Sequence, residues 1–287
     1  MGSVFYIGSA ASNSPYLVLD IQINPNGTNP LNSIQLNKSS DEPQERWSLY
    51  YYGTDQTPGS NWPLYFEIVS DLGGAGALTA GSNGSIELSS TLPSAPQFPE
   101  APPTDPPSLT KLWSVTPFPG PVNLGGFYLQ NVSTNQVVDV ANDSITSLAP
   151  VHQYPQNTKT NQNWILQPAT QSYIKKNDPN FPVYAPSLYV SGQPDPQGGD
   201  LVNVNGSDFP AGEEVLVIIG SVPGQGGNTT VTVGPDGAFS YSFQQMFPVS
   251  GTPAEAQDTF ASVAAIGSNN RLLAIAQASW IYFIAQN

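Results

Sequence analysis

Residues 135–140 read NQVVDV, residues 150–154 read PVHQY, and residues 162–166 read QNWIL. β-branched and aromatic residues recur in these runs, and turn-forming residues lie between them, which predicts three short β-strands. The last strand carries Trp164, a large side chain that a soluble fold has to bury. These runs decide the fold, because the chain repeats them.

The same order of runs occurs near the start of the chain, at residues 16–21 (YLVLDI), 33–37 (SIQLN) and 45–49 (ERWSL). Ile34 lies 13 residues before Trp47. Val151 lies at the same distance before Trp164. The two copies therefore share one register.

A third, degraded copy lies between them, at residues 77–80 (ALTA), 85–88 (SIEL) and 111–115 (KLWSV). Inside it, residues 93–107 hold seven prolines and predict an extended, solvated loop. Three copies of about 50 residues predict a closed barrel with pseudo-threefold symmetry, because no copy could bury its tryptophan alone.

This pattern resembles the ricin-B-type β-trefoil lectins, whose repeat has an aliphatic-Asp-aliphatic strand, a later aromatic residue and a closing Gln-x-Trp. The resemblance covers residues 1–172, and only the third copy keeps the closing motif, as Gln162-Asn163-Trp164. The other copies have Glu45-Arg46-Trp47 and Lys111-Leu112-Trp113. The resemblance implies an N-terminal β-trefoil domain that binds sugars, with galactose or N-acetylgalactosamine as the usual ligand.

The pattern changes in the last third of the chain. Residues 173–186 (YIKKNDPNFPVYAP) are typical of a linker, and residues 187–287 hold seven candidate strands. Turn sequences such as GPDG at 234–237 separate the strands. Residues 204–213 (VNGSDFPAGE) resemble bacterial immunoglobulin-like modules. The fold class is therefore predicted as all-β, with an N-terminal β-trefoil followed by a C-terminal immunoglobulin-like β-sandwich.

Composition excludes several classes of partner. The chain has 26 glycines and 29 prolines in 287 residues, which leaves little room for long helices. A net charge of −14 disfavours nucleic acid and anionic membrane surfaces as partners. The longest apolar run, at residues 280–285, is too short to insert across a membrane. The first cation is Lys38, so we expect no secretory signal peptide, and both cytoplasmic residence and non-classical export stay open.

The third copy contains the residue types that a sugar site needs: Asp139, His152, Tyr154, Asn161 and Gln162. An aromatic ring suits the C–H face of a sugar, while a carboxylate and amides suit its hydroxyls. By the family resemblance, Asp139 accepts bonds from two hydroxyls, Tyr154 stacks on the ring, and Asn161 bonds a further hydroxyl. Gln162 then braces Asp139, and His152 adds a polar contact.

We expect Asp139 and Tyr154 to lie at the surface. The alternative interpretation is that Asp139 and Asn161 are turn residues and that Tyr154 is ordinary surface packing. The first copy keeps Asp20 but has Asn37 at the aromatic position, which indicates a relic site. The second copy has Thr79 and Ser89 at the two positions, and we expect no site there.

The sequence has few of the features that catalysis needs. His152 is the single histidine, the chain has no cysteine, and no Gly-x-Ser-x-Gly turn surrounds a serine. We therefore predict no catalytic residue, no metal ligand and no cofactor. The predicted function is a non-enzymatic lectin whose partners are glycans or glycoproteins.

Two alternatives remain. The trefoil could be an interaction scaffold that blocks a protease, or the binding subunit of a toxin or hydrolase complex. A single sugar site is weak, and pairing of chains would raise its avidity. The strand at residues 272–284 is strongly apolar, so we predict a homodimer through the C-terminal domain.

Overall fold

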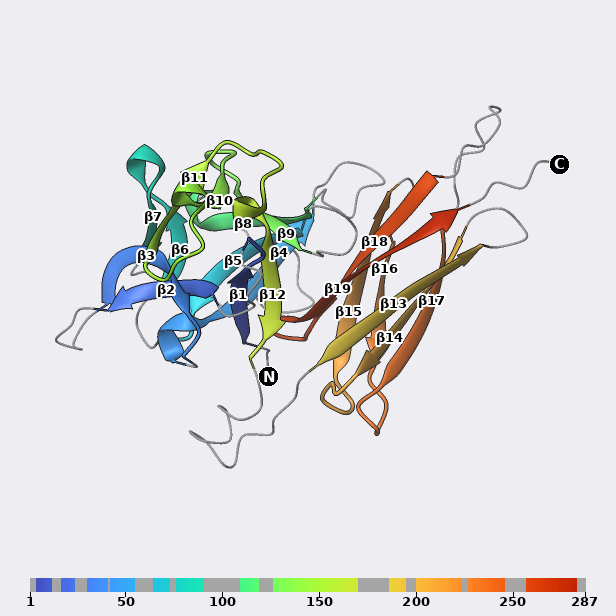
Figure 1. Ribbon diagram of the computed structural model, residues 1–287. Helices are drawn as coiled ribbons and strands as arrows, with labels where there is room; N and C mark the ends of the chain where they lie inside the picture. Colours follow the sequence, from blue (N-terminus) through green and yellow to red (C-terminus); the bar gives the residue numbers. More distant parts are fainter. Residues whose placement is uncertain are drawn as a thin grey trace.

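The computed structural model describes residues 4–11, 17–23, 30–40, 42–54, 64–72, 76–89, 109–118, 126–169, 186–194, 200–222, 227–245 and 257–282. Its regular elements are β-strands and single 3-10 turns, so the described part of the chain is all-β, as predicted. None of the described segments forms a helix long and apolar enough to cross a membrane. The strands build two bodies that lie side by side (Figure 1). Residues 93–107 and 173–185, the predicted proline-rich loop and most of the predicted linker, lie outside the described residues.

The N-terminal body is a closed antiparallel barrel of six strands. In ring order the strands are β1 (Phe5–Ser9), β4 (Arg46–Thr54), β5 (Leu64–Ser70), β8 (Leu112–Pro117), β9 (Phe127–Asn131) and β12 (Trp164–Pro168). Each strand pairs with the next, and β12 closes the ring on β1. Each predicted repeat thus contributes two barrel strands.

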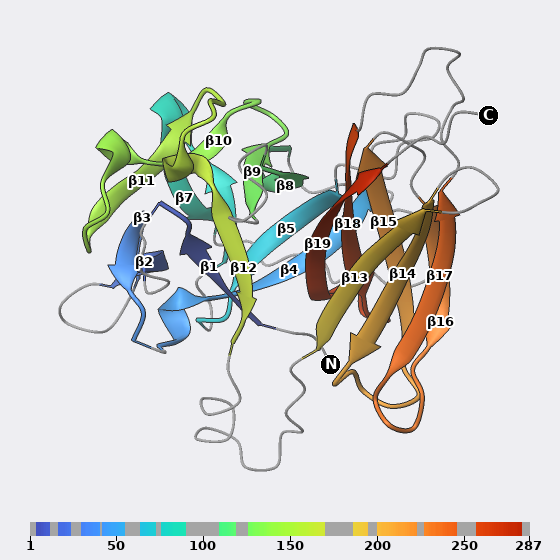
Figure 2. The same cartoon turned by 45° about the vertical axis from the view of Figure 1, so that its right-hand side comes forward.

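Each repeat also contributes one hairpin. The three hairpins are β2 (Leu17–Ile23) with β3 (Pro30–Lys38), β6 (Ala77–Ala80) with β7 (Ile86–Ser89), and β10 (Val137–Val140) with β11 (Ala149–Tyr154). They gather on the side of the barrel away from the C-terminal body (Figure 2). β11 also pairs with β3 there. Six barrel strands with three hairpins form a β-trefoil-like fold.

The three tryptophans occupy equivalent positions and are fully buried. Each indole Nε1 donates a hydrogen bond to a backbone carbonyl in the hairpin of its own repeat. The pairs are Trp47 with Leu19 at 3.1 Å, Trp113 with Leu78 at 2.9 Å, and Trp164 with Val138 at 2.9 Å. A buried indole N–H needs such a partner. The shared geometry confirms the three repeats that the sequence predicted.

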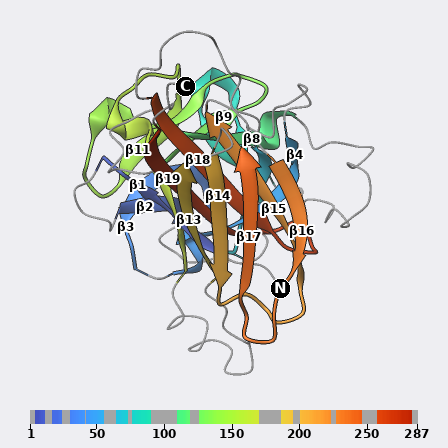
Figure 3. The same ribbon diagram turned by 90° about the vertical axis from the view of Figure 1, so that its right-hand side faces the viewer.

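The C-terminal body consists of two facing sheets, and Figure 3 looks onto the sheet of β13, β14 and β17 with the other sheet behind it. One sheet contains β13 (Ser187–Pro194), β14 (Asp200–Ser207) and β17 (Phe239–Gln245). The other has the order β16 (Gly227–Thr232), β15 (Glu214–Val222), β18 (Gln257–Ile266) and β19 (Leu272–Tyr282). Val204 and Phe239 of the first sheet share an apolar core with Val217 and Val263 of the second. The seven predicted strands are all present.

The four-stranded sheet packs on the barrel with its other face. Ile218, Ile266 and Leu272 belong to the same buried cluster as the barrel tryptophans. At the edge of this contact, the Asn270 carbonyl accepts a hydrogen bond of 2.6 Å from the Tyr51 N–H. The Arg271 guanidinium lies 5.5 Å from the centroid of the Tyr50 ring. On the barrel side, β4 and β5 reach toward β18 and β19 (Figure 2), and Gln277 of β19 donates a hydrogen bond of 3.0 Å to the Gly126 carbonyl next to β9.

This contact bears on the strand assigned to dimerisation. Leu273 and Ala274 of β19 are buried in the core between the two sheets, while Leu272 and Ile275 pack toward the barrel. These residues of β19 are therefore used within the chain. The side chains at 279–284 lie outside the described residues.

Candidate functional site

The structure brings all five candidate residues into one cluster. Asp139 on β10 and His152 on β11 face each other across the hairpin, and Tyr154 lies two residues further along β11. Asn161 and Gln162 lie on η5 (Thr160–Gln162), the 3-10 turn just before the Trp164 strand. The hairpin and the turn therefore place the five side chains together.

Asp139 is the centre of the cluster. Its Oδ2 accepts hydrogen bonds from Asn161 Nδ2 at 2.9 Å and from Gln162 Nε2 at 2.8 Å. Its Oδ1 lies 3.1 Å from His152 Nε2. The residue is only 4% exposed, so the expectation of a surface position was wrong for Asp139. The imidazole and the η5 turn enclose the carboxylate.

Burial raises the pKa of Asp139, because a carboxylate loses hydration when it is enclosed. The hydrogen bond from Gln162 and the charge of His152 oppose part of this rise, while Asp143 adds to it. Asp143 forms an exposed ion pair with Lys159, at 2.9 Å between Oδ2 and Nζ. The site is thus a buried carboxylate with charged groups near its edge.

Tyr154 is 52% exposed, in agreement with the expectation for this residue. Its ring centroid lies 5.8 Å from that of His152, with 33° between the two planes. The side chain of His152 is partly exposed beside it. An aromatic surface therefore lies next to the enclosed carboxylate.

The two amides support the carboxylate from inside. Gln162 Nε2 also donates to the Pro155 carbonyl at 3.1 Å, and its Oε1 accepts from the Asn157 N–H at 2.7 Å. Asn161 Nδ2 also donates to the Val140 carbonyl at 3.1 Å, and its Oδ1 is buried without a hydrogen-bond partner. Gln162 braces Asp139 as expected. The expected bond from Asn161 to a sugar hydroxyl does not fit this arrangement, because Asn161 is buried and its amide nitrogen is used within the protein.

Residues 110–179 match the family model of the ricin-type β-trefoil lectin domain-like proteins. This segment contains all five candidate residues. No curated protein matches the chain.

Several solved structures are similar to the chain. The designed threefold-symmetric protein ThreeFoil is 18% identical, with 57% of this chain and 96% of that chain covered and a TM-score of 0.39. The C-half of an earthworm R-type lectin in complex with GalNAc is 23% identical, with coverage of 58% and 98% and a TM-score of 0.34. The agglutinin of Rhizoctonia solani is 16% identical, with coverage of 58% and 94% and a TM-score of 0.38.

The first repeat differs from the third in what faces its carboxylate. Asp20 Oδ2 accepts from Gln35 Nε2 at 3.0 Å and from Asn37 Nδ2 at 3.2 Å. Asn37 also accepts a hydrogen bond from Ser147 of the third repeat. Glu45, at the position of Gln162, accepts from the Ser40 N–H at 2.8 Å. Asp20 thus lies against protein amides, and no aromatic ring stands at the position of Tyr154.

The second repeat has no carboxylate at this position. Thr79 Oγ1 donates to the Ala77 carbonyl of its own strand at 3.0 Å. Across the described ranges, no three His, Asp or Glu side chains gather as metal ligands would. Among the three repeats, only the third combines a braced carboxylate with an exposed aromatic ring.

Sequence reasoning missed the part that the second repeat plays in this region. Ser85 forms an isolated β-bridge with His152. Gln153 Nε2 donates to the Ser85 carbonyl at 2.7 Å, which holds the second hairpin against the third. No spacing within one repeat signals this contact, because it joins two repeats.

Proposed function

We propose that the chain is a non-enzymatic lectin whose third repeat binds glycans that end in galactose or N-acetylgalactosamine. The observation that carries the proposal is the geometry of Asp139 and Tyr154. One carboxylate oxygen is held by two protein amides, and the other lies 3.1 Å from the partly exposed His152, whose ring stands beside the exposed ring of Tyr154. A sugar needs such a pair, because its apolar face stacks while its hydroxyls form hydrogen bonds.

Each group has a distinct part in binding. Tyr154 takes the C–H face of the sugar, and a hydroxyl donates to Oδ1 of Asp139. A carboxylate oxygen accepts more than one hydrogen bond, so Oδ1 can hold a hydroxyl and the imidazole together. His152 reaches Oδ1 from the exposed side and is the second polar contact of the sugar. Asn161 and Gln162 act through Asp139 as positioning residues.

The choice of sugar rests on the family resemblance. Galactose and N-acetylgalactosamine are the usual ligands of ricin-B-type lectins, so they are the first probes. A trefoil protease inhibitor is the less favoured alternative, since it has no use for a braced carboxylate beside an exposed ring. The binding subunit of a toxin or hydrolase complex would use the same sugar site.

For the C-terminal body we propose an immunoglobulin-like sandwich, supported by seven antiparallel strands in sheets of three and four. We also propose the domain boundaries 1–172 for the trefoil, 173–186 for the linker and 187–287 for the sandwich. The homodimer through the C-terminal domain stays a prediction, to be checked by light scattering on the full chain.

The test is a glycan array with the full-length protein, followed by calorimetric titration with N-acetylgalactosamine and galactose. Binding to glycans that end in either sugar is the expected result. A protein that binds no glycan on the array and neither sugar at millimolar concentration would overturn the proposal. A sugar-binding protein whose affinity does not depend on Asp139 would show that the site lies elsewhere.

A further inference from the structure

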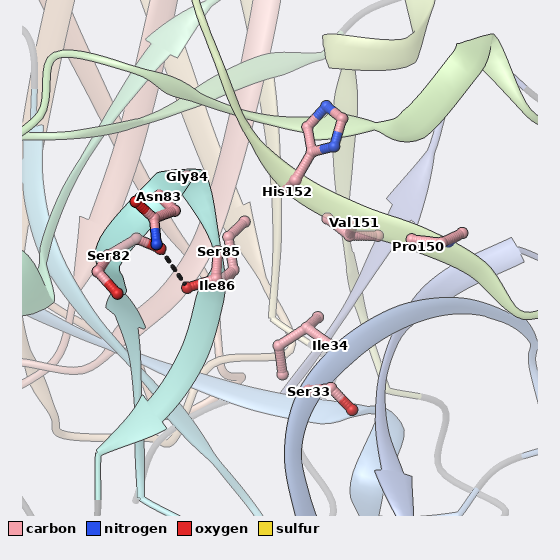
Figure 4. Close-up of a pocket in the computed structure, with 10 residues that line it drawn as sticks. All are labelled: Ser33, Ile34, Ser82, Asn83, Gly84, Ser85, Ile86, Pro150, Val151 and His152. Carbon is pink, nitrogen blue, oxygen red and sulfur yellow. Dashed lines mark hydrogen bonds between the residues drawn. The ribbon is translucent and has the colours of Figure 1, made fainter.

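A pocket of about 540 Å³ lies where the hairpins of the three repeats meet. The first repeat contributes Ser33 and Ile34, and the second contributes residues 82–86 from η2 (Ser82–Gly84) and β7. The third contributes Pro150, Val151 and His152 (Figure 4). This volume lies within the usual range of about 300–1,000 Å³ for small-molecule sites.

The lining of the pocket is apolar inside and polar at the rim. Ile34, Ile86 and Val151 are buried side chains of the barrel core, one from each repeat. Exposed Ser33, Ser82 and Asn83 stand around them with hydroxyl and amide groups. No Asp, Glu, Lys or Arg lines the pocket. An apolar floor with a neutral polar rim suits a neutral ligand that carries both C–H groups and hydroxyls, such as a sugar ring.

The pocket is contiguous with the Asp139 cluster through His152. This residue lines the pocket and also lies 3.1 Å from Asp139. In Figure 4 its imidazole stands at the rim and points away from Ile34 and Ser33. β11 runs from Pro150 at the pocket to Tyr154 at the cluster, a span of roughly 13 Å at the usual rise of a strand. The β-bridge between Ser85 and His152 fixes the pocket wall against this strand.

We infer that the ligand of the third repeat is an oligosaccharide, whose terminal sugar binds at Tyr154 and Asp139 and whose next sugar occupies the pocket between the hairpins. This inference rests on the proposed function and extends it from a monosaccharide to a glycan of two or more units. His152 is then the residue that both sugars contact. Because one wall belongs to the second repeat, that repeat takes part in binding although it has lost its own carboxylate.

Calorimetric titration of the full chain tests the inference. The monosaccharide probes are methyl β-galactoside and N-acetylgalactosamine. The second set contains disaccharides with these sugars at the non-reducing end, in several linkages, including lactose and N-acetyllactosamine. We expect at least one disaccharide to bind about tenfold more tightly than its monosaccharide, an ordinary gain for a second occupied subsite.

A blocking variant separates the pocket from the Tyr154 cluster. Ser82→Trp places a large ring at the pocket mouth from an exposed position, and we expect it to remove most of the disaccharide's advantage while the monosaccharide still binds. Ser240→Trp, on the exposed side of β17, is the matched control and should leave both affinities as in the wild type. If Ser82→Trp also loses the monosaccharide, Ser33→Trp is used instead, because it blocks the pocket from another wall. The deciding quantity is then the ratio of disaccharide affinity to monosaccharide affinity in Ser33→Trp.

The possible outcomes test the pocket subsite separately from the sugar site at Asp139 and Tyr154. Equal affinity for monosaccharides and all disaccharides, or a disaccharide advantage that survives both blocking variants, would overturn the inference and leave the proposed function standing. A wild-type protein that binds neither set of probes would overturn the proposed function and the inference with it.

Discussion

Gln162 donates a hydrogen bond of 2.8 Å to Oδ2 of Asp139, and both side chains are buried. Two residues later, Trp164 donates to the carbonyl of Val138, the residue before Asp139. The glutamine and the tryptophan of the Gln-x-Trp sequence therefore form hydrogen bonds to two successive residues of one strand. The tryptophan bond recurs in all three repeats and stabilises the barrel, whereas Glu45 and Lys111 replace the glutamine in the other two. Only in the third repeat does the closing motif add a hydrogen bond to the carboxylate of its hairpin.

The first prediction concerns Asp139. Asp139→Asn should abolish sugar binding but change the midpoint of thermal unfolding little, because an amide oxygen in place of Oδ2 still accepts from both Asn161 and Gln162 and carries no charge to desolvate. Asp139→Ala should destabilise the fold by about 1–3 kcal/mol, because it removes the shared acceptor of two buried amides. Titration calorimetry and thermal unfolding followed by circular dichroism measure the two effects.

Asp20→Asn is the matched control, since Asp20 is the equivalent buried carboxylate of the first repeat and lacks the aromatic neighbour. It should leave sugar binding intact. Loss of binding in Asp20→Asn with retention in Asp139→Asn would place the site in the first repeat.

The second prediction concerns Tyr154. Tyr154→Ala should abolish detectable sugar binding and change the free energy of unfolding by no more than about 0.5 kcal/mol, as is usual for exposed positions. Tyr189→Ala removes a tyrosine of β13, outside the trefoil, that is even more exposed than Tyr154, and should bind sugar as the wild type does. If the two variants behave alike in a titration, stacking on Tyr154 is not part of the site.

The barrel and the five candidate residues were predictable because the signal lies within single repeats. The same 13-residue spacing joins the hairpins of the first and third repeats to their tryptophans, and the five residues come from one repeat. The burial of Asp139 was not predictable, because it depends on how His152 and the η5 turn close over it. The contact of Ser85 with His152 joins two repeats and leaves no trace in the spacing of either.

One run of the sequence indicates that the C-terminal sheets pack against a further part of the protein. Residues 215–219 read VLVII, without the alternation of a strand that has one solvated face. Such a run is typical of a strand buried on both faces. In the structure, Val215, Val217 and Ile219 face the sandwich core while Ile218 faces the barrel cluster.

The third prediction concerns pH. Burial raises the pKa of Asp139 above its ordinary value of 3.8, so sugar binding should be lost on acidification before an ordinary aspartate would protonate. The folded state then holds this proton more tightly than the unfolded state. The contribution of Asp139 to stability is therefore full below the unfolded pKa and is lost as the pH rises through the folded pKa. Acid should thus weaken binding in a range where Asp139 itself favours the fold.

Titrations at a series of acidic pH values, each paired with a thermal melt, test this prediction. His152→Gln repeats the series without the imidazole, and Lys159 and Asp143 remain as the exposed charged neighbours. Because the charge and the hydrogen bond of His152 both lower the pKa of Asp139, the acidic midpoint should move to higher pH in any binding that this variant retains. Loss of binding only where the protein unfolds would show that Asp139 does not control it.

The last prediction concerns the contact between the two bodies. Because Ile218 and Leu272 share the barrel's buried cluster, the full chain should unfold in a single calorimetric transition. Ile218→Asp places a charge in this contact without altering the sandwich core, and should split the transition into two while both bodies stay folded. Asn228→Asp adds the same charge at an exposed position of neighbouring β16, and should keep one transition.

A fragment of residues 1–172 tests the same contact by removing the C-terminal body. It should expose an apolar face at β4 and β5 and unfold at a lower temperature than the full chain. Two separate transitions in the wild type would contradict this coupling, and the barrel and sandwich would then be independent units.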